Sequence, residues 1–242
     1  MKAIFKKEIN RFFSSPSGTL IIVIFLLINS SLLWWISGTG QNILEAGYSN
    51  IDPLFFIAPF LLILFIPAIC MNSFSAEIEN GTIETLKTKP ITNLQIILGK
   101  YFAIITIVSL SILPTFTYLF SVYYLSENGI DLGGITGSYI GLFLLSFVFA
   151  SISLFCSSLS RNPLSALIIS IIMCSLFYFG FDIISNIDTL EPFKIEISKL
   201  GIASHYKTLS KGLLALTDVL YFLIITMLFL QFTNLNLNKK ND

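Results

Sequence analysis

The sequence predicts an all-α integral membrane protein: six transmembrane helices, an amino-terminal amphipathic helix at the membrane interface, and a short cytoplasmic helix between the second and third spans. Of the 242 residues, 55% are hydrophobic and 12% are charged, and the mean hydropathy is +0.84. About a quarter of the residues of soluble domains are charged. The apolar residues also gather in six runs, each near the roughly 20 residues that a membrane-spanning helix needs. Lysine and arginine, finally, are unequally shared between alternate loops.

The composition also argues against several kinds of binding site. The formal net charge is zero, so no electrostatic attraction to nucleic acid is expected. Cys70, Cys156 and Cys174 each lie inside an apolar run and are interpreted as packing residues. The single histidine, His205, stands in a polar stretch without a second ligand nearby and is interpreted as an ordinary loop residue. We therefore expect no metal and no cofactor.

The first element is a helix over residues 1–14 with two chemically different faces. Lys2, Lys6, Lys7, Asn10 and Arg11 occupy one face, and Ile4, Phe5, Ile9, Phe12 and Phe13 occupy the other. Basic amphipathic helices of this kind lie in the membrane interface. Pro16 interrupts the helix before the first span. That span ends in Trp34-Trp35 and not in a small-residue cleavage site, so we interpret it as a retained span and not a signal peptide.

The apolar runs place the spans within a single domain over residues 1–242. The spans are expected at about 19–36, 54–72, 101–125, 135–158, 163–181 and 214–232. Pro59, Pro67 and Pro114 lie inside these runs and predict kinks. An even number of spans leaves both termini on one side of the membrane.

The basic residues predict which side that is. Most of them fall on the side that holds both termini: Lys2, Lys6, Lys7, Arg11, Lys87, Lys89, Lys100, Arg161, Lys239 and Lys240. The short opposite loops over 37–53 and 126–134 contain no lysine or arginine, and the long loop over 182–213 contains four lysines, Lys194, Lys199, Lys207 and Lys211. Because short cytoplasmic loops are enriched in lysine and arginine, both termini are predicted to be cytoplasmic.

No Asp, Glu, Lys, Arg or His lies in the interior of a predicted span, and Asp182 and Asp218 lie only at outer ends. Ionisable residues within the bilayer are the usual mark of ion and proton pathways. A carrier driven by a proton or sodium gradient is therefore disfavoured. An intramembrane enzyme is disfavoured too, because the spans supply no catalytic residues.

The cytoplasmic segment from Ser73 to Lys100 has clear helix boundaries. Asn80-Gly81 predicts the end of a helical extension of the second span, since glycine tolerates left-handed backbone. Thr82 then predicts the cap of a short helix that ends before Pro90, with Glu84 in its first turn.

After the proline, Thr92-Asn93-Leu94-Gln95 matches a capping box, which predicts a new helix from about Asn93 that runs directly into the third span. The string from Gly81 to Thr88 is not a phosphate-binding loop, because Leu86 stands where such a loop needs glycine. No ATPase site is therefore expected in this chain.

This segment carries a family resemblance. The string A-E-I-E-N-G-T-I-E-T-L-K-T-K-P over 76–90, followed by I-L-G-K, resembles the E-x-E-x-G-T-x-E-x-L-x-x-x-P loop of type-2 ABC transporter permeases. The stretch over 204–222 is similar to the segment before the last span of these permeases. One departure is Thr217 before Asp218, where many relatives have a basic residue, and this weakens the expectation of a salt bridge at the outer face.

The resemblance implies a single permease domain coupled to a separate cytoplasmic ABC ATPase subunit. The helix over Thr82–Lys89 would be the coupling helix that rests on the ATPase. The implied coupling positions are interface and hinge residues and not catalysts: Glu77, Glu79, Gly81, Thr82 and Glu84.

Within that family the chain most resembles the permease subunit associated with bacterial gliding motility. This implies an exporter in the bacterial cytoplasmic (inner) membrane, with a second membrane subunit that has a large outer domain. The alternative is a membrane anchor or scaffold for a motility or secretion machine, which would share the same composition. The outer segment over 182–213 holds two stretches that could form short helices split by Gly201. In relatives of this family such helices re-enter the membrane from outside, and the alternative is a plain interfacial loop. The sequence does not identify the substrate.

Overall fold

The structure is a computed structural model that describes residues 1–36, 42–43, 51–82, 91–126, 129 and 131–239. Within these ranges the regular structure is entirely helical. Six helical segments are long and apolar enough to cross a membrane. They contain α2 (Pro16–Trp34), α3 (Asp52–Cys70), α6 (Asn93–Ile112), α8 (Leu132–Leu159), α9 (Pro163–Ser185) and α12 (Leu216–Lys239). The predicted all-α fold with six spans is thus confirmed.

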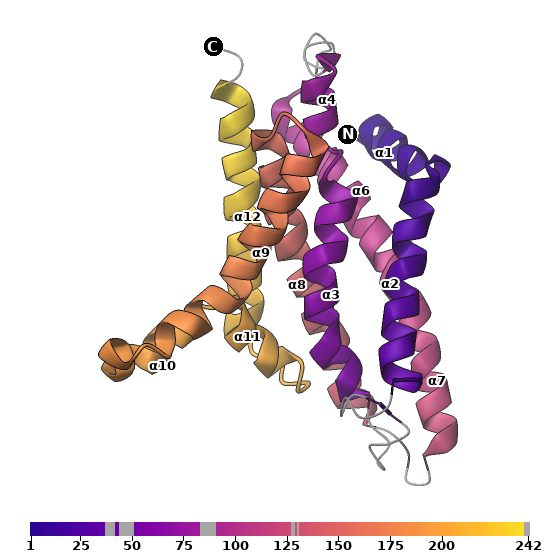
Figure 1. Cartoon of the computed structure of the whole chain (residues 1–242), viewed down its shortest axis with the longest axis vertical. Helices are drawn as coiled ribbons and strands as arrows, with labels where there is room; N and C mark the ends of the chain where they lie inside the picture. Colours follow the sequence, from indigo (N-terminus) through magenta and orange to yellow (C-terminus); the bar gives the residue numbers. More distant parts are fainter. Residues whose placement is uncertain (37–41, 44–50, 83–90, 127–128, 130, 240–242) are drawn as a thin grey trace.

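The spans form an elongated bundle with α8 at its centre, packed against α3, α6, α9 and α12. Both chain termini lie at one end, which we call the terminal end (Figure 1). The apolar stretch of α8 is 78% buried, against 22% for that of α2 and 17% for that of α9. The outer helices expose large apolar side chains such as Leu27 and Ile172. Such a surface suits contact with lipid tails.

The prolines act differently at different positions. At Pro114 the α-helix gives way to a 3-10 turn, η1 (Leu113–Thr115), before α7 (Phe116–Leu125) completes the span. Pro59 and Pro67 lie inside α3, which remains α-helical through both. At the terminal end α3 is followed by a short continuation, α4 (Ser75–Glu79).

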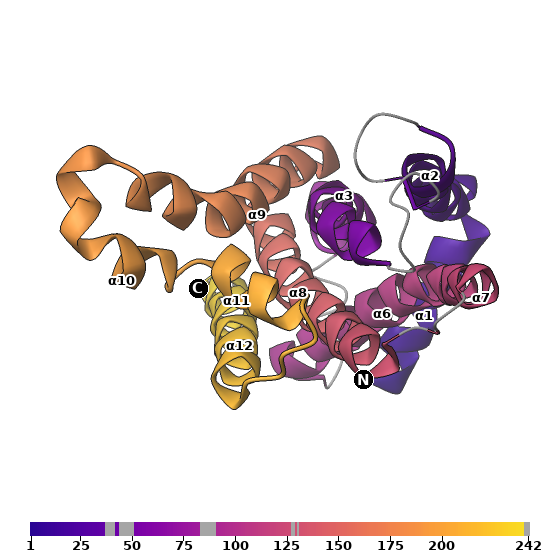
Figure 2. The same ribbon diagram turned by 90° about the horizontal axis from the view of Figure 1, so that it is seen from below.

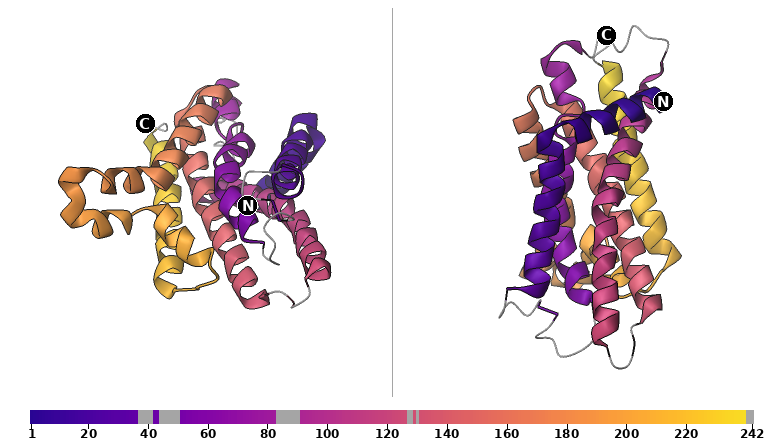
Figure 3. Two further views of the ribbon diagram at one scale, coloured as in Figure 1. Left: turned by 60° about the horizontal axis from the view of Figure 1, so that its bottom comes forward. Right: turned by 90° about the vertical axis from the view of Figure 1, so that its right-hand side faces the viewer.

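The amphipathic helix α1 (Lys2–Ser14) crosses the terminal end of the bundle at a steep angle to the spans, as the right view of Figure 3 shows. Two glycines allow its close contacts. A Cβ atom at Gly99 of α6 would lie 3.1 Å from the Ile4 side chain, and one at Gly18 would lie 2.2 Å from the Phe12 carbonyl oxygen. The predicted amphipathic helix is therefore present, and Ile4 and Phe12 of its apolar face pack on the bundle.

At the opposite end, the segment between the last two spans folds into η2 (Asp188–Phe193), α10 (Lys194–Ser198) and α11 (Ile202–Leu209). The part around α10 projects sideways from the bundle, as seen from below (Figure 2). Helix α11 packs back against α8, α9 and α12, and buries Ile202 and Tyr206. Of the two alternatives for this segment, short helices on either side of Gly201 are found, with α10 before it and α11 after it. His205 lies in α11, so its prediction as a loop residue was wrong, because the tertiary packing of α11 orders that stretch as a helix.

Candidate functional site

The terminal end contains a buried ion cluster that joins three helices. The Lys100 Nζ atom, on α6, lies 3.0 Å from Glu8 Oε1 of α1 and 2.9 Å from Glu77 Oε2 of α4. The same ammonium group donates a hydrogen bond to the Ser73 carbonyl oxygen. Lys7 Nζ lies 3.1 Å from Glu77 Oε1. We call Lys7, Glu8, Glu77 and Lys100 the ion cluster.

Burial makes these contacts energetically important. The side chain of Lys100 is 1% exposed and that of Glu77 is 6% exposed. A charge taken out of water is costly unless an opposite charge and hydrogen bonds compensate it. The two lysines and two glutamates have no formal net charge, and the Lys100 ammonium also lies 4.9 Å from the centre of the Phe74 ring. Each buried charge in the cluster is therefore compensated only while α1, α4 and α6 stay together.

The end of α4 has the geometry that the sequence predicts. Gly81 adopts φ 66°, the left-handed conformation that ends a helix. The Asn80 side chain donates to the Ala76 carbonyl oxygen at 2.8 Å, and the Thr82 hydroxyl donates to the Glu77 carbonyl oxygen at 3.3 Å. Glu79, Gly81 and Thr82 are exposed.

The predicted coupling positions therefore divide into two groups. Glu79, Gly81 and Thr82 lie on an exposed surface, whereas Glu77 is buried in the ion cluster. Glu84 and most of the predicted helix over Thr82–Lys89 lie outside the described residues. Beyond them, the predicted capping box is confirmed, because the Thr92 hydroxyl accepts from the Gln95 amide and the Gln95 side chain accepts from the Thr92 amide.

The burial of Lys100 and Glu8 was not predicted from the sequence. Lys100 was counted only among the lysines on the basic side of the membrane, although it lies about two turns inside the helix that begins at Asn93 and is fully buried there. The signal for Glu8 was available, since Ile4, Glu8 and Phe12 are spaced four residues apart and share one helix face. A carboxylate on the apolar face of an amphipathic helix predicts a buried cationic partner.

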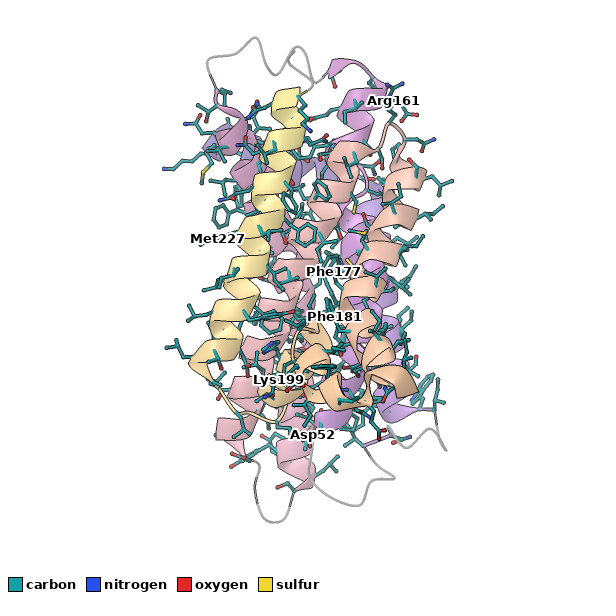
Figure 4. The ribbon with its side chains drawn as sticks, turned by 90° about the vertical axis from the view of Figure 1, so that its left-hand side faces the viewer. Asp52, Arg161, Phe177, Phe181, Lys199 and Met227 are labelled. Atoms are coloured by element: carbon teal, nitrogen blue, oxygen red, sulfur yellow. The ribbon has the colours of Figure 1, made fainter. Side chains whose placement is uncertain are left out.

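A second polar group lies at the opposite end, where α11 meets α12. His205 Nδ1 lies 2.7 Å from Asp218 Oδ1, and His205 Nε2 lies 2.8 Å from the Lys199 carbonyl oxygen. The imidazole ring stacks on Tyr221 at 3.9 Å between ring centres. Asp218 thus obtains its partner from α11, although the preceding residue is not basic. Figure 4 shows Lys199 and Asp52 near one end of the bundle and Arg161 at the other.

A cavity of about 430 Å³ opens between α3, α9 and α11. Its wall is mainly aromatic and also carries charged groups: the aromatic residues are Phe55, Phe56, Phe60, Tyr178, Phe179 and Tyr206, and the charged residues are Asp52, Asp182, Lys207 and Lys211. Lys207 Nζ lies 3.1 Å from Asp182 Oδ2. Such a cavity can hold an apolar or aromatic group that also carries a polar part able to meet the charged side chains.

Tyr206 connects the two sides of this cavity. Its hydroxyl donates to the Phe55 carbonyl oxygen at 2.8 Å, which ties α11 to α3. Burial raises the pKa of Tyr206 well above its ordinary value, so the hydroxyl keeps the proton that it donates. In the part of the chain that the structure describes, no three His, Cys, Asp or Glu side chains gather as a metal site would require.

Comparison with known proteins agrees with this architecture. Residues 2–240 match the family model described as ABC-2 family transporter protein. No curated protein matches the chain. The match covers nearly the whole sequence, including α1, all six candidate spans and both polar sites. Membership of this family implies a multi-pass membrane subunit of an ABC transporter and an ATPase partner. The chain therefore belongs to the ABC-2 transporter family.

Proposed function

We propose that this chain is the permease subunit of an ATP-driven exporter linked to bacterial gliding motility. It would act in the cytoplasmic (inner) membrane with both termini in the cytoplasm, beside a separate ABC ATPase and a second membrane subunit with a large outer domain. Family membership supports the permease role. The link to motility and the second subunit rest on the resemblance of residues 76–90 and 204–222. The orientation rests on the lysine and arginine asymmetry.

The observation that carries the coupling mechanism is the position of α4. Its exposed end, with Glu79 and Thr82, leads directly into the segment proposed to rest on the ATPase. Its buried face carries Glu77, whose carboxylate is held by Lys100 of α6 and Lys7 of α1. A displacement of α4 would separate buried opposite charges unless α1 and α6 moved with it. The four elements α1, α3, α4 and α6 are therefore proposed to respond to the ATPase as one unit.

Helix α3 provides a path from that unit to the cavity at the other end. It is continuous with α4 across a short turn, and its Phe55 and Phe60 line the aromatic wall. A movement of α3 relative to α9 and α11 would change the shape of the cavity and strain the hydrogen bond from Tyr206 to Phe55. We propose that the exported substrate places an apolar or aromatic part in this cavity. That would make ATP-driven motion at one end alter substrate contact at the other.

Reconstitution with the partner ATPase tests this function. In Glu79→Lys, a cation replaces a carboxylate on the exposed end of α4. If Glu79 faces a basic group of the ATPase, the lysine places two positive charges side by side at the interface, which costs several kcal/mol of binding free energy. We expect Glu79→Lys to insert normally but to lose ATPase association or substrate-stimulated hydrolysis. Glu191→Lys, an exposed change in η2 at the far end, should leave both unchanged.

The same assay separates a transporter from a scaffold. A scaffold would bind its partners normally, yet no candidate substrate would stimulate ATP hydrolysis. Equal coupling in Glu79→Lys and Glu191→Lys would remove the coupling role from the end of α4.

A further inference from the structure

A second cavity, of about 230 Å³, lies at the terminal end between α1, the first turns of α2, the last turn of α3, and α6. Its two halves differ chemically. Arg11, Ser15 and Ser17 supply polar groups where α1 turns into α2, and Ile21, Ala68 and Ile107 supply apolar surface from the spans. Ile107 lies about 10 Å beyond Lys100 along α6, at about 1.5 Å per residue. The cavity therefore runs from the level of the interfacial helix into the apolar part of the bundle.

The charges around the cavity leave one cation uncompensated. Glu8 and Lys100 line it, but both belong to the ion cluster, whose four formal charges cancel. Arg11 forms no ion pair with any described carboxylate, and its guanidinium makes one long hydrogen bond, 3.4 Å, to the Asn72 carbonyl oxygen. A guanidinium has five N–H donors and matches the geometry of phosphate oxygens. Arg11 thus gives the polar half of the cavity a net positive charge and unused donors.

The neighbouring hydroxyl groups add to this polar half. The Ser15 and Ser17 Oγ atoms lie 2.5 Å apart and hydrogen-bond to each other at the start of α2. One hydroxyl donates in this bond, so the other keeps its proton for an external acceptor, and both oxygens lie where a phosphate could meet them. Lys2 and Lys6 are exposed on the same interfacial helix, which favours an anionic membrane surface around it.

We propose that this cavity binds an anionic glycerophospholipid. The phosphate lies between Arg11 and the two serine hydroxyls, and the upper part of one acyl chain lies along Ile21, Ala68 and Ile107. A soluble phosphate would match the polar half alone and would leave the apolar half without a partner. The bound lipid joins α1 to α2, α3 and α6 beside the ion cluster. This inference goes beyond the transport function and does not depend on it.

Lipid binding to the purified full chain tests the site without ATP. After delipidation, native mass spectrometry measures the binding of phosphatidylglycerol and phosphatidylcholine. We expect wild type to bind phosphatidylglycerol about tenfold more tightly than phosphatidylcholine. Arg11→Gln should abolish that preference. Lys6→Gln removes an equal charge from the exposed face of the same helix, outside the cavity, and should keep the preference within about twofold.

A second pair of variants tests the acyl chain. Ala68→Leu and Ile21→Phe narrow the apolar half from α3 and from α2, and leave Arg11 in place. Both residues are half-buried, so the added atoms should fit without unfolding the chain. We expect either variant to weaken the binding of both lipids by about tenfold or more.

Three results would overturn the proposal. The first is an equal loss in Lys6→Gln and Arg11→Gln, which would indicate general attraction of α1 to anionic lipid. The second is unchanged lipid binding in both narrowed variants, which would remove the acyl chain from the cavity. The third is complete displacement of phosphatidylglycerol by millimolar glycerol phosphate, which would identify a site for a soluble anion.

Discussion

The substitution Lys100→Met tests the ion cluster most directly. Methionine keeps most of the length and apolar surface of the lysine side chain but removes the ammonium group. Glu8 loses its only cation within ion-pair distance among the described residues, and Glu77 keeps Lys7 alone. The carboxylates remain largely enclosed, since their side chains are 12% and 6% exposed. The variant therefore leaves buried negative charge without sufficient compensation.

The size of the effect follows from this burial. Removing one partner of a buried ion pair costs about 3–5 kcal/mol. Lys7 and partial access of water to Glu8 relieve some of that cost, so we expect about 2–4 kcal/mol. For a chain of this size, 1 kcal/mol corresponds to about 2–4 °C in the unfolding midpoint. Lys100→Met should therefore lower the midpoint by roughly 4–16 °C.

The assay is thermal unfolding of the detergent-purified chain, with two controls. Lys194→Met removes a lysine from the exposed surface of α10 and should shift the midpoint by less than about 2 °C. The triple variant Lys100→Met, Glu8→Gln, Glu77→Gln removes the unpaired charges as well. Because replacing a whole buried ion pair by uncharged groups is often neutral, the triple variant should recover most of the lost stability.

Two results would refute this reasoning. If Lys100→Met unfolds at the same temperature as Lys194→Met, the buried contacts of Lys100 do not form in the protein. If the triple variant is no more stable than Lys100→Met, the cost does not come from unpaired carboxylates.

Three further substitutions test other contacts by the same thermal assay. Gly18→Ala would place a Cβ atom 2.2 Å from a backbone carbonyl oxygen of α1 and should destabilise the contact between α1 and α2. At Gly180 the nearest atom to an added Cβ is 3.6 Å away, so Gly180→Ala should be tolerated. Tyr206→Phe removes a buried hydrogen bond to α3 and should cost about 1–2 kcal/mol; an unchanged midpoint would exclude that bond. His205→Ala leaves the largely buried Asp218 without its partner and should cost about 2–4 kcal/mol, part of which Asp218→Asn should restore if the pair is responsible.

The helices were predictable because local properties of the chain decide where they form. A run of about 20 apolar residues has to span a bilayer as a helix, since lipid offers the backbone no hydrogen bonds. Local chemistry likewise fixed the helix ends at Gly81 and Thr92, where left-handed backbone and a capping box were expected and are found. The amphipathic pattern of residues 1–14 likewise predicted the separate helix α1 before the first span.

The contacts of the charged residues depended on tertiary structure. The sequence placed Lys100 among the basic loop residues and selected Glu77 as a coupling position, but gave no reason to join them to Glu8, which lies more than ninety residues before Lys100. Likewise, the partner of Asp218 is His205, supplied by a separate helix.

The sequence by itself thus determined the membrane fold, the number of spans and the helix boundaries around the proposed coupling segment. Only the tertiary structure decided which charges are buried together and where cavities remain. The physical reason is the distance along the chain over which each kind of interaction acts. Hydrophobic length and capping act within a few turns of one helix. Ion pairs and cavities depend on which side chains from helices distant in sequence come together, here those of α1 with α6 and of α11 with α3.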